Sequence, residues 1–398
     1  MVRCPILEPC CFNMSFETTS VRTRIFFACQ VTQLLVIQHL RLHLCAGDEK
    51  DFLVWHPFAD DEFIDGSMKE IISVAKYAGV LDMRDFHSLK PRRRGGLWFL
   101  ESPRRLRHDA CLLRNWMTVH HIKEETTEIW VDDPIHFYAQ LPRAFLRKAR
   151  HIKYPHCFNH EDRMSLLTRS VLEGQYKDQR WAKRMLFSPW QRLTTGIDFR
   201  KSIASFDRAY TFFERSNWSS DSVDVSNLIS LEAFEKTFES LPLSLRSEIC
   251  SIETVLAKAS RPLIILLLFG LTPSLRRAYK TSVSRIFSER SRELAGGTLA
   301  VKVHPARYGL EEKKLICWLQ NNVPVNVVPI TIGVNLELML PRIRPTYVWA
   351  GPCGAMPIVQ RLGIGRPIIL PEIAAPLSDG NLQDLEKHEE FVRGMEVW

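Results

Sequence analysis

The sequence lacks the cysteine spacings that build metal sites and the long apolar runs that cross membranes. None of its 10 cysteines forms a CxxC pair or a Cys/His ligand set, and dispersed cysteines favour a reducing compartment with mostly buried free thiols. The most apolar stretch, residues 262–271, is about half the ~20 residues that a membrane-spanning helix needs. Residues 25–44 contain several polar side chains, and no small-residue cleavage site follows them. We therefore expect a cytoplasmic protein with no metal and no secretory signal.

The composition is that of an ordinary folded protein with an excess of basic residues. The chain has 398 residues, of which 45% are hydrophobic and 25% charged, and this length favours two domains over one. The formal net charge of +8 favours anionic partners such as phosphorylated donors, acidic glycans or lipid headgroups. The aromatic residues do not alternate with a basic face, which argues against binding of nucleic acid.

Strand and helix patterns alternate in two separate blocks. The first block starts at residue 24 with a strand, a turn and a helix, followed by a strand at 52–57, a helix at 68–78 and a strand at 128–131. The second block has strands at 263–269, 298–303, 325–329, 347–350 and 367–370, separated by helices at 275–292, 311–321, 336–340 and 355–362. Strand–helix–strand alternation predicts parallel sheets covered by helices on both faces.

The pattern therefore predicts an α/β fold with two Rossmann-like domains that face each other across a cleft. We expect an irregular arm at residues 1–23, an N-terminal α/β domain at 24–240 and a C-terminal Rossmann-like domain at 255–398. Between the two blocks, residues 161–260 mix polar and aromatic side chains, and we expect helical decoration and an interdomain connection there.

Candidate functional residues follow the predicted strands, because ligands of parallel sheets bind beyond the carboxyl ends of the strands. Asp132 and Asp133 follow the strand at 128–131. A carboxylate at this position can act as a base toward an acceptor hydroxyl, and an aspartate before a proline can equally form a turn.

The second block supplies groups suited to a phosphorylated ligand. Lys302, His304 and Pro305 end one strand, and Glu337 lies at the start of a short helix. A glycine-containing turn that enters a helix follows another strand and consists of Gly351, Pro352, Cys353 and Gly354. Such a turn offers main-chain N–H groups and a positive dipole end to a phosphate, and a histidine can neutralise a departing phosphate.

These segments resemble bacterial sialyltransferases and polysialyltransferases of the GT-B type, the group with an HP motif. The matching segments are VDDP, KVHP, NLELMLP and AGPCGA, and the resemblance covers residues 24–57, 128–134 and 262–370. Pro134 replaces the family's glycine in the acidic motif, and Cys353 replaces a serine whose hydroxyl would donate to phosphate.

The resemblance implies transfer of a sialic-acid-type sugar from a CMP donor to a glycan acceptor, in a single in-line displacement. Asp133 or Asp132 would be the base, His304 would stabilise the leaving phosphate, and Glu337 would hold the ribose. Lys302, Pro305 and the turn from Gly351 to Gly354 would complete the nucleotide-sugar site of the C-terminal domain, opposite an acceptor-side N-terminal domain. Neither a metal ion nor a cofactor is needed.

Two alternatives remain open at this point. The same fold could use another nucleotide-sugar donor, or a non-catalytic basic protein could bind acidic polymers. The densest basic segment, residues 90–94 with Arg104, Arg105 and Arg107, is expected to be a solvated loop. The alternative is that it contacts an acidic acceptor, or the anionic surface of the inner membrane at its periphery.

Overall fold

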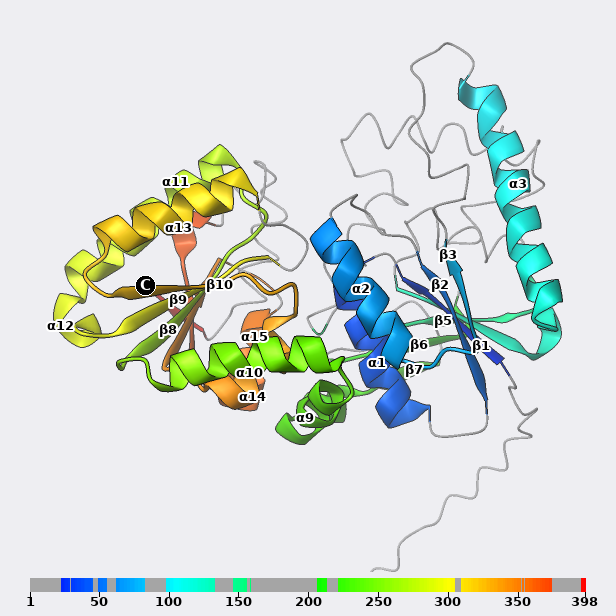
Figure 1. The fold of residues 1–398 in the computed structure, drawn as a ribbon, viewed down its shortest axis with the longest axis horizontal. Coiled ribbons are helices and arrows are strands. Elements are labelled where there is room, and N and C mark those ends of the chain that lie inside the picture. Colours follow the sequence, from blue (N-terminus) through cyan, green and yellow to red (C-terminus); the bar gives the residue numbers. More distant parts are fainter. Residues whose placement is uncertain are drawn as a thin grey trace, which may run out of the picture.

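Two parallel β-sheets, of seven and six strands, form the framework of the protein. The computed structural model describes residues 23–28, 30–45, 49–55, 62–82, 98–132, 146–155, 158, 206–212, 221–304, 309–351, 353, 355–373 and 395–398. Figure 1 shows the two sheets side by side, each with helices packed against it. The predicted α/β fold of two Rossmann-like units, which is the GT-B arrangement, is confirmed.

The central strands of the N-terminal sheet, β1, β2 and β4, are almost completely buried. In space the strand order of this sheet is β3-β2-β1-β4-β5-β6-β7. The strands are β1 (Thr23–Ala28), β2 (Lys50–Trp55), β3 (Gly79–Asp82), β4 (Thr127–Val131), β5 (Arg150–Lys153), β6 (Arg208–Thr211) and β7 (Ser222–Asp224). Parallel strands need a crossover between them, and the described crossovers include α1 (Val31–Leu44), α2 (Glu62–Val74) and α3 (Trp98–Val119).

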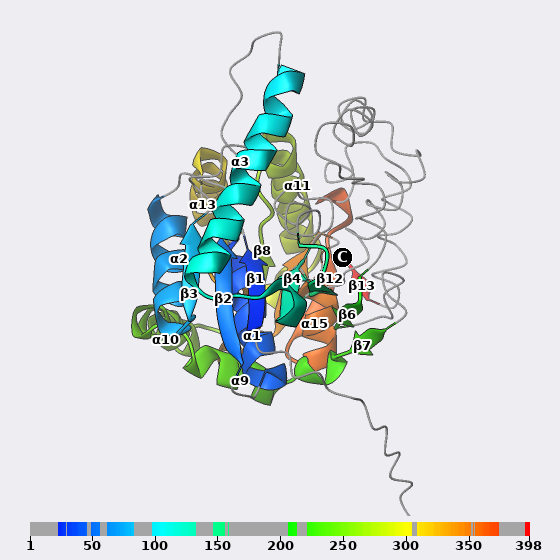
Figure 2. The ribbon, with the colours of Figure 1, turned by 90° about the vertical axis from the view of Figure 1, so that its right-hand side faces the viewer.

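Helices lie on opposite faces of this sheet. Apolar residues of α1 and α2 pack with Phe26, Leu53 and Trp130, whereas Leu113 and Met117 of α3 pack with the alternate side chains of the same strands. Figure 2 shows α3 running across the near side of the sheet. Alternation of side chains between the two faces explains why residues 25–28 of β1 are consecutively apolar and are covered on both sides.

The C-terminal sheet repeats this design with the strand order β10-β9-β8-β11-β12-β13. Its strands are β8 (Leu263–Leu267), β9 (Thr298–Lys302), β10 (Asn326–Ile330), β11 (Tyr347–Ala350), β12 (Arg366–Ile369) and β13 (Glu396–Val397). The helices are α11 (Pro273–Glu289), α12 (Ser291–Leu294), α13 (Leu310–Asn322), α14 (Leu340–Ile343) and α15 (Ala355–Leu362), with a 3₁₀ turn η4 (Leu336–Leu338). Thr272 starts α11 by accepting a hydrogen bond from the N–H of Leu275, and Pro273 occupies its first turn.

Two helices between the sheets, α9 (Leu231–Glu239) and α10 (Leu243–Ala257), connect the two halves of the molecule. One apolar cluster continues from α1 through Phe234 and Phe238 of α9 to one face of the C-terminal sheet. Buried His39 of α1 anchors this junction, with its ring nitrogens 2.7 Å from Thr237 Oγ1 and 3.2 Å from the carbonyl oxygen of Leu228. Burial lowers the pKa of His39 to about 3, so the ring is neutral at neutral pH.

Several sequence expectations differ from the structure. Residues 161–260 were expected to add helical decoration, but within their described part β6 and β7 are strands that extend the N-terminal sheet. These strands are only four and three residues long, too short for a clear period-two pattern. Strand β3 and helix α3 were also missed, and Arg104, Arg105 and Arg107 lie within α3 and not in a loop. The other basic residues, at 90–94, fall outside the described residues, as does nearly all of the arm at 1–23.

The predictions about membrane-spanning segments and buried cysteine thiols can be tested only on the residues that the structure describes. Among the helices described, none combines the length and apolar character that a bilayer crossing requires. Five described cysteines carry free thiols: Cys45, Cys111, Cys250, Cys317 and Cys353. Cys111 and Cys317 are exposed and the other three are only partly buried, so the expectation of mostly buried thiols was wrong for these five.

Candidate functional site

Each sheet has one position where the strand order reverses, and these positions are where ligands of open parallel sheets bind. In the N-terminal sheet the reversal lies between β1 and β4, and in the C-terminal sheet it lies between β8 and β11. Asp132 directly follows β4, whereas Gly351 and Cys353 directly follow β11. The sequence candidates therefore occupy the switch points of both sheets.

A residue in the first turn of α1 holds Asp132 in place. It is 2% exposed, and its Oδ2 accepts a hydrogen bond from Nε2 of Gln33 in the first turn of α1. Oε1 of Gln33 in turn accepts a hydrogen bond of 2.9 Å from the N–H of Gln30. The sequence analysis missed Gln33, which lies at the start of the first helix that it predicted.

Lys302 ends β9 with a buried ammonium group directed at the main chain. Nζ donates to the carbonyl oxygens of Val303, at 2.9 Å, and Ile332, at 2.8 Å. These bonds join the segment that leads to His304 to the segment that follows β10. Burial lowers the pKa of Lys302 to about 7, against the opposing influence of Glu337 and Glu248. Direct contact of Lys302 with a donor stays a prediction; in the structure it supports the adjoining loops.

Glu337 lies in η4 and is 6% exposed. Burial raises its pKa to about 7, while Lys302 acts in the opposite direction. Two ionisable groups of opposite sign thus lie close to the carboxyl ends of β9 and β10 with pKa values near neutrality. His304, one residue after Val303, is only partly buried and is therefore open to contact with a ligand.

The two described residues of the turn after β11 differ in how deeply they are buried. Gly351 is buried and Cys353 is partly buried against the apolar cluster that joins the two halves. The main-chain oxygen of Cys353 accepts a hydrogen bond of 3.1 Å from the N–H of Met356 in α15. This turn therefore leads directly into a helix N-terminus, as the sequence predicted.

Gly351 is required because no side chain fits at its position. An added Cβ would lie 2.7 Å from Cγ2 of Ile373 and 3.1 Å from Cε2 of Phe269. We expect Gly351→Ala to lower the free energy of unfolding by about 1–3 kcal/mol, because overpacking displaces neighbours. Urea denaturation measures this loss. Combining it with Ile373→Ala, which removes the clashing methyl group, should cost less than the sum of the two single substitutions, and strict additivity would contradict the steric explanation.

Two buried residues that sequence reasoning did not select shape the same edge of the C-terminal sheet. Glu312 of α13 accepts hydrogen bonds of 2.8 Å from the N–H groups of both Leu271 and Gly309. It thereby connects the loop after β8 to the loop after β9. Tyr279 of α11 donates to the carbonyl oxygen of Leu267 at 2.8 Å and accepts from the N–H of Phe269 at 3.2 Å. The available signal for Glu312 was a glutamate in the first turn of a predicted helix, which can accept a hydrogen bond from the main chain at the helix start.

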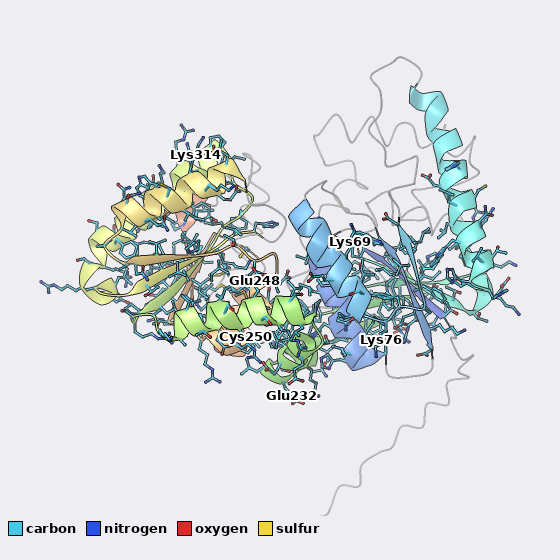
Figure 3. All side chains as sticks on the ribbon, in the orientation of Figure 1. Lys69, Lys76, Glu232, Glu248, Cys250 and Lys314 are labelled. Carbon is cyan, nitrogen blue, oxygen red and sulfur yellow. The ribbon has the colours of Figure 1, made fainter. Side chains whose placement is uncertain are left out.

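Charged groups of α10 lie between the two halves. Glu248 lies on α10 and Lys69 on α2 (Figure 3), and Ser244 of α10 donates a hydrogen bond of 2.5 Å to Glu70 of α2. Desolvation and the neighbouring Glu70 raise the pKa of Glu248, while Lys302 lowers it. The carboxyl end of β9 is therefore electrostatically coupled, through α10, to a helix of the N-terminal sheet.

Four predicted site residues fall outside the described residues: Asp133, Pro305, Pro352 and Gly354. Their roles stay predictions. Five described candidates belong to the C-terminal half: Lys302, His304 and Glu337 lie at β9 and η4, and Gly351 and Cys353 follow β11. Asp132 belongs to the other sheet.

Comparison with known proteins shows similarity of fold only. No family model and no curated protein matches the chain. Among solved structures it is similar to LpCGTa in complex with UDP, with a TM-score of 0.48, 13% identity, and coverage of 88% of this chain and 80% of that one. It is also similar to the UDP-GlcNAc 2-epimerase from Methanocaldococcus jannaschii, with a TM-score of 0.48, 10% identity, and coverage of 92% and 91%.

A third similar structure is the GT-B domain of the sialyltransferase from Photobacterium damselae, with a TM-score of 0.45 and 12% identity. The alignment covers 90% of this chain and 97% of that one. At such identities and TM-scores the likenesses decide neither a donor nor a reaction. The strand orders of the chain itself define its class, an α/β protein with two Rossmann-like sheets in the GT-B arrangement.

Proposed function

We propose that the protein is a glycosyltransferase that moves a sialic-acid-type sugar from a CMP donor to a glycan acceptor. The observation that supports this most is the placement of complementary groups at the two switch points. A carboxylate follows β4 in one sheet, and a glycine-containing turn into a helix follows β11 in the other. The first suits activation of a hydroxyl group, and the second suits a phosphate.

The reaction is a single displacement at the anomeric carbon of the donor sugar. Asp132, or its neighbour Asp133, takes the proton of the acceptor hydroxyl as the acceptor oxygen bonds to the anomeric carbon. The bond from that carbon to the phosphate oxygen breaks, and its electron pair stays on CMP. His304 donates a hydrogen bond or proton to that phosphate, and the N–H groups of the turn that starts at Gly351 spread the remaining charge. No metal ion takes part in this scheme.

Residues behind the site keep its loops in place. Lys302 holds the segment that leads to His304 against the segment that follows β10, through Val303 and Ile332, and Glu312 holds the loops after β8 and β9 together. Glu337 is assigned to the donor ribose, whose neighbouring hydroxyls a carboxylate accepts in pairs. The acceptor is a glycan, for which the net charge of +8 favours an acidic one, and the protein acts in the cytoplasm.

A nucleotide screen tests the donor assignment. We expect CMP to raise the thermal unfolding midpoint by a few degrees at about 100 times its Kd, because a ligand that binds only the folded state stabilises it by about 2.7 kcal/mol. UDP and GDP should have smaller effects, and His304→Ala should reduce the effect of CMP. Differential scanning fluorimetry at one ionic strength measures all of these midpoints.

Any other outcome of the nucleotide screen would indicate a different function. Stabilisation by UDP or GDP in preference to CMP would keep the fold and the reaction class but change the donor. No stabilisation by any nucleotide, together with retained binding of acidic polymers by His304→Ala, would overturn the proposal in favour of a non-catalytic binding protein.

A further inference from the structure

We infer that Gln33 is a positioning residue that fixes the carboxylate of Asp132 for proton transfer. The inference rests on the proposed function, since it concerns the base of that reaction. Gln33 is fully buried in the first turn of α1 and lies 99 residues from Asp132 in the sequence. A buried glutamine this close to a catalytic carboxylate must have its polar atoms satisfied, and both ends of its amide are used.

Hydrogen bonds at both ends of the Gln33 side chain define the orientation of its amide. Oε1 accepts from the N–H of Gln30 at 2.9 Å, so Nε2 is the end that points to Asp132. A flip of the amide would place Nε2 against the N–H of Gln30 and Oε1 against a carboxylate oxygen. Both of those contacts are repulsive, so the amide has one stable orientation.

The strand ends on either side of this pair are also held in place. Tyr154 donates through its hydroxyl to the carbonyl oxygen of Phe27 at 2.5 Å, and its N–H donates to the carbonyl oxygen of Val131 at 2.9 Å. The carboxyl ends of β1 and β4 are thereby fixed relative to each other. Asp132 therefore has a position defined by β4 and an orientation defined by α1.

Orientation of this kind contributes to catalysis in two ways. A hydrogen bond donated to a carboxylate favours its ionised form, which is the form that accepts a proton. A fixed carboxylate also needs no reorganisation when the acceptor hydroxyl arrives, and misplacement by about 1 Å can cost about 10²-fold in rate. Gln33 contributes to both effects without touching substrate.

Kinetics of Gln33→Leu and Gln33→Glu test the inference. We expect Gln33→Leu to lower kcat about 10- to 100-fold with an unchanged KM for the donor, and to move the acidic limb of the pH profile of kcat/KM to higher pH. Gln33→Glu keeps an acceptor for the N–H of Gln30 but places a carboxylate beside Asp132, so its acidic limb should move further in the same direction.

Gln38→Leu is the matched control. Gln38 is the other buried glutamine of α1, and its Oε1 accepts a hydrogen bond from Arg41 at 3.3 Å. Its replacement should change stability but leave the pH profile in place, because Gln38 does not contact Asp132. A pH profile that is the same in Gln33→Leu and in the wild type would overturn the positioning role.

A measurement that does not depend on activity separates this inference from the proposed function. The urea midpoint is measured for Gln33→Leu, for Asp132→Leu and for the double variant. If Gln33 holds Asp132, the double shift will be smaller than the sum of the single shifts, whereas additive shifts would overturn the inference even in an inactive protein. Absence of transfer from every nucleotide sugar, with the coupling present, would instead reject the proposed function.

Discussion

Asp132→Asn is expected to lower the rate of sugar transfer by about 10²- to 10⁴-fold, the contribution that general bases typically make. The amide keeps the size and the acceptor oxygen that Gln33 contacts, but it cannot take the proton of the acceptor hydroxyl. Nucleotide binding should be unchanged, because the donor-side candidates Lys302, His304 and Glu337 belong to the other sheet. Steady-state kinetics, combined with the CMP-induced shift in unfolding midpoint, measures both quantities.

Asp109→Asn is the matched control, a buried aspartate on a helix that packs against the same sheet. Asp109 is fully buried on α3, and its replacement should affect stability while leaving kcat within a few-fold of the wild type. Asp133→Asn discriminates between the two adjacent carboxylates of the VDDP segment. A full loss of transfer in Asp133→Asn, with an active Asp132→Asn, would assign the base to Asp133 and contradict the role of Asp132.

Lys302→Met is expected to lower the free energy of unfolding at pH 7 by about 1–3 kcal/mol, the cost of leaving buried polar groups without their hydrogen-bond partner. The methionine fills the volume but leaves the carbonyl oxygens of Val303 and Ile332 without this donor. It also leaves Glu337 without its neighbouring cation. Urea denaturation measures the loss, and the double variant with Glu337→Gln should recover part of it, because the carboxyl group is then no longer present.

Glu337 and Lys302 make the stability of the protein depend on pH in opposite directions. The folded-state pKa of Glu337, about 7, lies above its ordinary value of 4.5, so its contribution to stability is complete below pH 4.5 and is lost as pH rises through 7. The folded-state pKa of Lys302, also about 7, lies below its ordinary 10.5, so its contribution is complete above pH 10.5 and is lost as pH falls through 7. Lys302→Met should retain the first effect and lose the second.

Urea midpoints at pH 5, 7 and 9.5 distinguish these contributions. The wild type should show its lowest contribution from this pair near pH 7, whereas Lys302→Met should show no recovery between pH 7 and 9.5. A variant that loses less than about 1 kcal/mol and has the same pH dependence as the wild type would show that the two groups are not coupled.

Much of the C-terminal sheet could be predicted from the sequence because strands such as β8 and β11 are continuous apolar runs with clear boundaries. The predicted strands at 298–303 and 347–350 correspond to β9 and β11, and the predicted helix at 355–362 matches α15. The N-terminal sheet was harder. Strands β6 and β7 are short and partly exposed, and β6 joins the sheet through β5, which lies far earlier in the sequence. Local periodicity therefore carries little signal for them.

The candidate site residues also divide into those that the sequence could reveal and those that it could not. Asp132, His304 and Cys353 could be selected because each follows a strand, and strand ends are visible in an apolar pattern. Gln33 and Glu312 could not, because their importance lies in hydrogen bonds to partners 99 and 41 residues away. A glutamine on a helix and a glutamate near a helix start are common in any sequence.

The sequence by itself determined the class of fold and the candidate chemistry, because apolar periodicity and the residues after each strand are local properties of the chain. Only the tertiary structure decided where the strand order reverses, which candidates flank each reversal, and which of them are buried. Lys302 illustrates the difference. Its charge is evident in the sequence, but burial against the carbonyl oxygens of Val303 and Ile332 moves its pKa to about 7, because desolvation depends on everything packed around a group and not on its neighbours in the chain.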